Sequence, residues 1–170
     1  MKVLYIGNYK DGTGWGNACA NNILALDAVG VDVVPRAITF NNSNGGCNER
    51  ILELESKSES GCDICIQHTL PHLYSYSSKF KNIGFIETET SNFIESSWQH
   101  HANLMDKILV PVSSSKEACI RSGVTRPIEV VPHCLDIDKY KSYKELNQGS
   151  KIEQLLNTFN FGLQWTKKII

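Results

Sequence analysis

Short apolar runs alternate along this chain with longer segments in which apolar residues recur at the helical period. A strand that is buried on both faces of a parallel sheet has such a run, and its neighbour in the sheet is reached through a helical connection. The sequence predicts strands at residues 3–7, 32–38, 62–68, 82–86, 107–112 and 127–132. This alternation constrains the fold more than any other feature of the chain.

The intervening segments predict helices. The helix after the first strand has an apolar face made of Trp15, Cys19, Ile23 and Leu26, and Gly30 ends it. Residues 49–59 predict a short charged helix, and a second amphipathic helix is marked by Ile94, Trp98, Ala102 and Met105. Ser114 and Glu117 form a capping box that opens a helix ending at Gly123. Strands and helices together predict an α/β class, a Rossmann-like parallel sheet flanked by helices.

Composition excludes several kinds of protein. A length of 170 residues with a 41% hydrophobic share suits a compact domain, and a net charge of -1 predicts neither a nucleic-acid nor an anionic-membrane partner. The first apolar run is too short for a signal peptide, and no segment is long enough to span a membrane, so a cytoplasmic chain with free thiols is expected. Cys62 and Cys65 are expected on opposite faces of a strand, and the sequence predicts no metal and no cofactor.

A glycine-rich loop lies between the first strand and the first helix, where open α/β sheets bind ligands. Gly12, Gly14 and Gly16 lie in this loop, and the amides and helix dipole there attract anions. The spacing departs from the dinucleotide fingerprint, because Cys19 stands where the last glycine is required. We therefore expect Gly14, Trp15 and Gly16 to contact a ligand other than a dinucleotide.

Two further candidates follow predicted strands directly. His68 ends the third strand, where its imidazole is suited to proton transfer near neutral pH. Glu87 follows the fourth strand, with Glu89 two residues further on, and such carboxylates bind sugar hydroxyls or stabilise developing positive charge. Because carboxyl ends of parallel strands line one crevice, His68 and Glu87 are predicted to face it together as catalytic residues.

Three segments near the end of this region resemble a known family. Residues 108–113, closing with Ser113, are followed by residues 122–124 and then by Pro127-Ile128-Glu129-Val130-Val131-Pro132-His133-Cys134-Leu135-Asp136. This set is similar to the end of the N-terminal domain of retaining GT-B glycosyltransferases of the glycogen-synthase-like superfamily. Cys134 stands where that family commonly has glycine. The resemblance implies transfer of a sugar from a nucleotide-sugar to a sugar, lipid or protein acceptor, with Ser113, Glu89 and the glycine loop in substrate binding.

The same resemblance divides the chain. Residues 1–136 are expected to form the acceptor-side domain, and residues 137–170 a connector and the start of a missing donor-binding domain. The chain alone is then expected to be inactive, and to work with a separate donor-domain chain or by self-association. The alternative is a non-catalytic Rossmann-like module that pairs with another chain, and a dinucleotide enzyme domain is a third reading.

Overall fold

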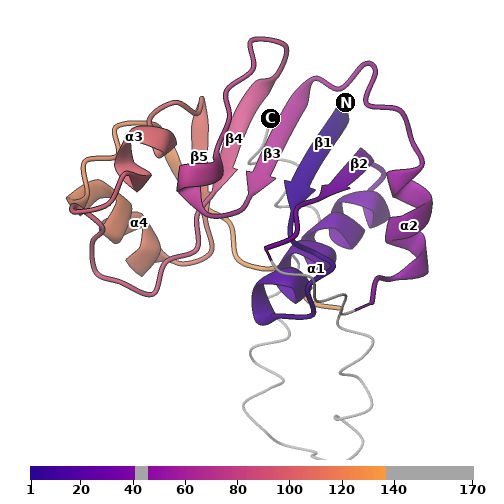
Figure 1. The fold of residues 1–170 in the computed structure, drawn as a ribbon, viewed down its shortest axis with the longest axis horizontal. Coiled ribbons are helices and arrows are strands. Elements are labelled where there is room, and N and C mark those ends of the chain that lie inside the picture. The colour runs from indigo at the N-terminus through magenta and orange to yellow at the C-terminus, as the bar shows by residue number, and fades with distance from the viewer. Residues whose placement is uncertain (41–45, 137–170) are drawn as a thin grey trace, which may run out of the picture.

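The computed structural model describes residues 1–40 and 46–136, so the expectations for residues 137–170 lie outside the described part. Within it, six parallel strands form one sheet in the order β2-β1-β3-β4-β5-β6 (Figure 1). The strands are β1 (Lys2–Gly7), β2 (Asp32–Ala37), β3 (Ile64–His68), β4 (Lys81–Phe85), β5 (Lys107–Val110) and β6 (Ile128–Val130). The predicted α/β fold with a Rossmann-like parallel sheet is confirmed.

Helical segments connect the strands and cover both faces of the sheet. They are α1 (Gly14–Ala28), α2 (Glu49–Glu55), the single turn η1 (Pro71–Leu73), α3 (Trp98–Ala102) and α4 (Ser113–Arg121). Successive residues of β5 show the two layers, because Leu109 belongs to the core beneath α1 and α2, and Ile108 to the core beneath α3 and α4. None of the helices in the described residues has the length and hydrophobicity needed to cross a lipid bilayer.

The chain reverses its direction across the sheet at β1. Strand β2 pairs with one edge of β1 and β3 with the other, so Gly7 lies level with both Ala37 and His68. Helices on opposite faces diverge at such a point and leave a crevice outside the carboxyl ends of the strands. The loop after β1 and the end of β3 therefore meet at the place where open α/β sheets bind ligands.

The loop after β1 is held by its own side chains. Asp11 Oδ1 accepts hydrogen bonds from the amide and the hydroxyl of Thr13 at 2.9 and 2.7 Å. Thr13 in turn caps α1, and its Oγ1 accepts from the Gly16 amide at 3.1 Å. At the other end Gly30 has a φ of +83°, which confirms its role in ending the helix.

Two helical predictions were wrong in detail. Helix α3 covers only Trp98–Ala102, and Ile94 is 63% exposed while its neighbour Phe93 is buried. Ser96 explains the late start, because its hydroxyl donates to Phe93 O at 2.8 Å and accepts from the Trp98 amide at 3.2 Å, which competes with helical bonds. Helix α4 begins at Ser113 with Val112 as its cap and no side-chain capping bond, so the predicted capping box at Ser114 is absent.

The cysteine prediction was also wrong for one pair. Cys62 and Cys65 lie in the same small buried cluster with Leu4 and Val34, on the face away from α1. Strand alternation does not reach Cys62, because β3 begins at Ile64 and Gly61 turns the chain with a φ of +79° just before it. All six cysteines lie among the described residues and are free.

Candidate functional site

A chain of hydrogen bonds runs along the carboxyl edge of the sheet through His68. The Tyr5 hydroxyl lies 2.8 Å from His68 Nδ1, and His68 Nε2 contacts Glu87 Oε1. Tyr5 and His68 come from adjacent strands and are 0% and 3% exposed. Glu87 follows β4, the next strand along, so three neighbouring strands supply the three groups. The structure thus brings the two predicted catalytic residues into direct contact.

The surroundings fix which atoms carry protons. Burial raises the pKa of Tyr5 well above its ordinary value, so the phenol stays protonated. Its oxygen accepts from Asn22 Nδ2 at 3.5 Å and its proton is donated to His68 Nδ1. With Nδ1 accepting from Tyr5, the nitrogen of His68 that donates to Glu87 is Nε2. His68 therefore orients Glu87, and its ring has no unoccupied basic nitrogen.

A second histidine approaches Glu87 from the far edge of the sheet. After β6, residues 131–134 cross beneath the carboxyl ends of the strands towards α1 (Figure 1). His133 Nε2 lies 3.4 Å from Glu87 Oε1, and its ring stacks on Phe85 and His68 at 5.6 and 6.1 Å. Burial lowers the pKa of His133, Glu87 opposes that shift and His68 adds to it. His133 is therefore neutral at pH 7.

Two hollows open beside this network, and Trp15 and Glu87 line both. The smaller, of about 10 Å³, is also lined by Asn8, His68, Thr69, Leu70 and Phe85, and this is room for about one water molecule. The larger is a groove of about 510 Å³ between Trp15 and the segment that leads from Glu87 to Trp98. Grooves of roughly 300–1,000 Å³ with mixed aromatic and polar linings suit small ligands.

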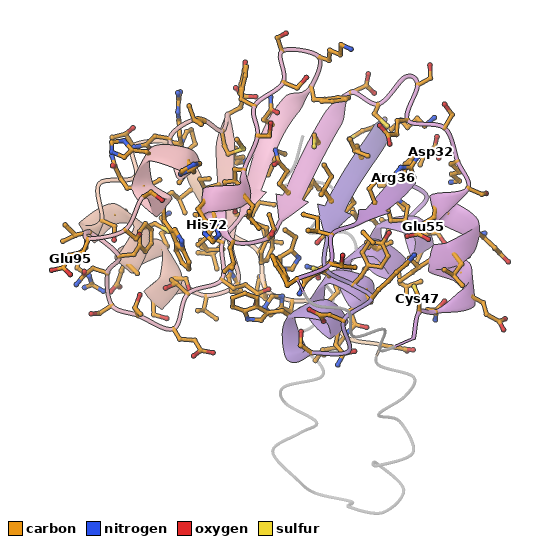
Figure 2. The ribbon with its side chains drawn as sticks, in the orientation of Figure 1. Asp32, Arg36, Cys47, Glu55, His72 and Glu95 are labelled. Atoms are coloured by element: carbon orange, nitrogen blue, oxygen red, sulfur yellow. The ribbon has the colours of Figure 1, made fainter. Side chains whose placement is uncertain are left out.

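The groove carries negative charge. Glu87, Glu89 and Glu95 line it, and its lining holds no lysine or arginine among the described residues. Glu95 lies at the outer rim of the molecule (Figure 2). Glu87 also lines the groove and contacts His68. Trp98 is fixed through its indole N–H, which donates to His72 Nδ1 at 3.2 Å.

Only some of the other predicted binding residues line the groove. Trp15 and Glu89 line the groove, whereas Ser113 is exposed at the start of α4 and lines neither hollow. Gly16 is buried, and a Cβ there would lie 2.2 Å from Asp11 Oδ1, so packing of the loop against α1 explains this glycine. Gly14 is exposed, with nothing within 4 Å of a Cβ. Because Asp11 already places a carboxylate on the loop, a phosphate site at Gly14 and Gly16 remains a prediction without added support.

Sequence reasoning missed Tyr5, Asn22 and His133. Tyr5 reads as an ordinary core residue of a buried strand, and Asn22 as a polar position of an amphipathic helix. His133 carried a usable signal, because it follows the sixth strand as His68 follows the third. Within the described residues, no group of three or more His, Cys, Asp or Glu side chains is arranged to hold a metal ion.

Comparison of the chain with protein-family models, with curated protein sequences and with solved structures finds no significant match.

Proposed function

We propose that residues 1–136 form the acceptor-side half of a retaining GT-B glycosyltransferase, which holds a saccharide acceptor in the groove beside Glu87. One observation carries the proposal: a carboxylate oriented by a buried histidine opens into a groove between two indoles at the switch point of the sheet. Tryptophan faces and carboxylates are the groups that pack on sugar rings and accept from sugar hydroxyls. The resemblance of residues 108–136 to the family supplies the reaction class.

In this proposal Glu87 accepts a hydrogen bond from the acceptor hydroxyl and so directs its oxygen towards the anomeric carbon of the donor. His68 acts through Glu87 as a positioning residue, because its Nε2 proton is already given to that carboxylate. Trp15 and Trp98 flank the sugar ring. The bond between the anomeric carbon and the nucleotide diphosphate breaks as the bond to the acceptor oxygen forms, and the hydroxyl proton passes to the departing diphosphate.

The negative charge of the groove favours binding of the nucleotide-sugar donor in a separate domain. A nucleotide diphosphate is stabilised by cations or by unoccupied helix N-termini, whereas this groove presents carboxylates. We therefore assign the donor to a separate domain that faces the groove. Positioning two substrates against one another contributes roughly 7–11 kcal/mol to lowering the barrier, so this half alone is expected to show no practical turnover.

Two measurements on the full chain test the proposal. The first is saccharide binding followed by NMR of the indole N–H signals, with expected weakening by Glu87→Gln and none by Glu53→Gln, whose carboxylate is exposed on α2. The second is nucleotide release from a panel of nucleotide-sugars and acceptors, with no acceptor-dependent release expected. Robust acceptor-dependent release that disappears in His68→Ala would show that the donor site lies in this chain. Absence of saccharide binding would favour the non-catalytic interaction module.

A further inference from the structure

The groove has more charge than recognition of neutral hydroxyls requires. Three carboxylates line it, at its inner end and along the segment that leads to α3. Arg121 reaches this segment, but its Nε donates to Ser91 O at 3.1 Å and its Nη2 lies 3.6 Å from Glu117 Oε2. Since no lysine or arginine lines the groove in the described part of the chain, its charge is left for a ligand to neutralise.

A second observation points to a ligand at the inner end. Thr69 is 8% exposed, and its hydroxyl has no hydrogen-bond partner among the described residues. Buried polar groups without a partner destabilise a protein, so such groups are normally satisfied by water or a bound molecule. Thr69 lines the small hollow that shares Trp15 and Glu87 with the groove. That hollow has room for about one water molecule, so we expect a water held by Thr69 beside Glu87, where a polar group of a ligand can bind to it.

The two tryptophans that line the groove favour a cation that is carried on a sugar ring. Trp15 and Trp98 both line the groove, and tryptophan faces attract cations as well as the C–H faces of sugar rings. An ammonium group has three N–H donors, which suit separate carboxylate acceptors. A protonated amine on a sugar ring satisfies both the aromatic and the acidic part of the lining, whereas a phosphorylated sugar is repelled by it.

We propose that the acceptor bound in this groove is an amino sugar, a saccharide that carries a protonated amine. The inference rests on the proposed function for the saccharide part and on the charge of the groove for the amine. Glu89 and Glu95 contact the amines, while Glu87 remains with His68 at the inner end to receive a hydroxyl.

The test compares two disaccharides with the same rings and linkage. The β-1,4-linked glucosamine disaccharide carries amines where cellobiose carries hydroxyls, and both are titrated into the full chain by calorimetry at a pH where the amines are protonated. Exposed ion pairs contribute modestly, and with two of them the glucosamine disaccharide is expected to bind about tenfold more tightly than cellobiose. Added salt should reduce this preference, because the pairs lie near solvent.

A double variant isolates the carboxylates. Glu89→Gln with Glu95→Gln should bring the two affinities close to parity, whereas the matched pair Glu49→Gln with Glu53→Gln on α2 should leave the preference unchanged. Equal binding of both disaccharides would contradict the proposed role of the amine but would still support saccharide binding in the groove. If a linear diamine binds as tightly as the glucosamine disaccharide, the groove does not recognise the sugar rings, and the proposal of a saccharide ligand is contradicted. Failure of both disaccharides to bind would overturn the proposed function itself.

Discussion

Gly16 shows how closely the loop after β1 packs against its helix. A Cβ at this position would lie 2.2 Å from Asp11 Oδ1 and 3.0 Å from the Asn8 carbonyl oxygen. We expect Gly16→Ala to destabilise the protein by about 1–3 kcal/mol, as overpacking of a buried site does. Gly14→Ala is the matched control: its Cβ meets nothing within 4 Å, and alanine favours helix, so it should be neutral or stabilising by less than about 1 kcal/mol. Urea denaturation of both variants measures the difference, and equal effects would contradict it.

His133 makes stability depend on pH in a defined direction. Its pKa is lowered in the folded chain, chiefly by burial, below the ordinary histidine value of 6.5. As pH falls through that ordinary value the unfolded chain binds the proton first, so the free energy of unfolding decreases until the folded imidazole is protonated as well. We expect His133→Gln to lose less stability than the wild type between about pH 7.5 and pH 5.5.

Denaturant unfolding at several pH values measures this dependence. His100→Gln is the control, because His100 is exposed on α3 and its removal should leave the dependence intact. The carboxylates with lowered pKa, such as Asp11 and Asp27, titrate below this window and do not interfere. A variant His133→Gln with the full wild-type dependence would contradict the assignment.

How much of the site the sequence reveals follows from where each residue sits. His68 and Glu87 could be predicted because each lies at or just beyond the carboxyl end of a strand, and a parallel sheet brings these ends together. Their hydrogen bond to one another could not, since it depends on the register of β3 against β4. Tyr5 could not be found at all, because a buried tyrosine in a strand looks the same whether or not it orients a histidine.

Arg36 ties the end of β2 to the end of α2. Its Nη1 donates to Pro35 O and Glu55 O at 2.8 and 3.0 Å, and its Nη2 to Lys57 O at 2.9 Å (Figure 2). The carbonyl groups of Glu55 and Lys57 lie at the end of the helix, where a cation is favourable and the oxygens lack helical partners. Arg36 thus helps to end α2 at Glu55, together with Ser56, whose hydroxyl donates to Glu53 O at 2.7 Å, and the helix stops four residues short of the predicted end at residue 59.

We expect Arg36→Gln to cost about 1–3 kcal/mol of unfolding free energy, because glutamine cannot reach all three carbonyls. Arg126→Gln is a suitable control, since the exposed Arg126 donates to one carbonyl, Asn103 O, at 2.7 Å. Hydrogen exchange should locate the loss, with the α2 amides of Arg36→Gln exchanging faster than those of α1. Uniform acceleration across the chain would argue against a local role.

Element positions were more predictable than element ends. The six strands and the helix after β1 follow from periodicity, which reports burial over many residues. Helix ends depend on single side chains that form bonds across the fold, as Arg36 does for α2, or that compete locally, as Ser96 does before α3. Such bonds leave no periodic trace in the sequence.

A hydrogen bond joins the first helix to the last residues of the described region. The Cys134 amide donates to Asn22 Oδ1 at 3.1 Å, and Asn22 is fully buried while its Nδ2 also reaches Tyr5. We expect Asn22→Ala to cost about 1–3 kcal/mol, because a buried amide and a phenol oxygen each lose a partner. Asn17→Ala, exposed on the same helix, is the control. Amides of residues 131–134 should lose hydrogen-exchange protection before those of β1, and unchanged protection there would contradict the bond.

The order of the strands in the sheet also bears on how the protein folds during its synthesis. β1 leaves the ribosome first and lies inside the sheet, and from β3 to β6 each newly made strand adds beside the one made just before it. The sheet can therefore extend in step with synthesis, without an earlier strand having to make way for a later one. His133 emerges after all six strands of the described residues, so the contact between His133 and Glu87 can form only when this sheet has been fully synthesised.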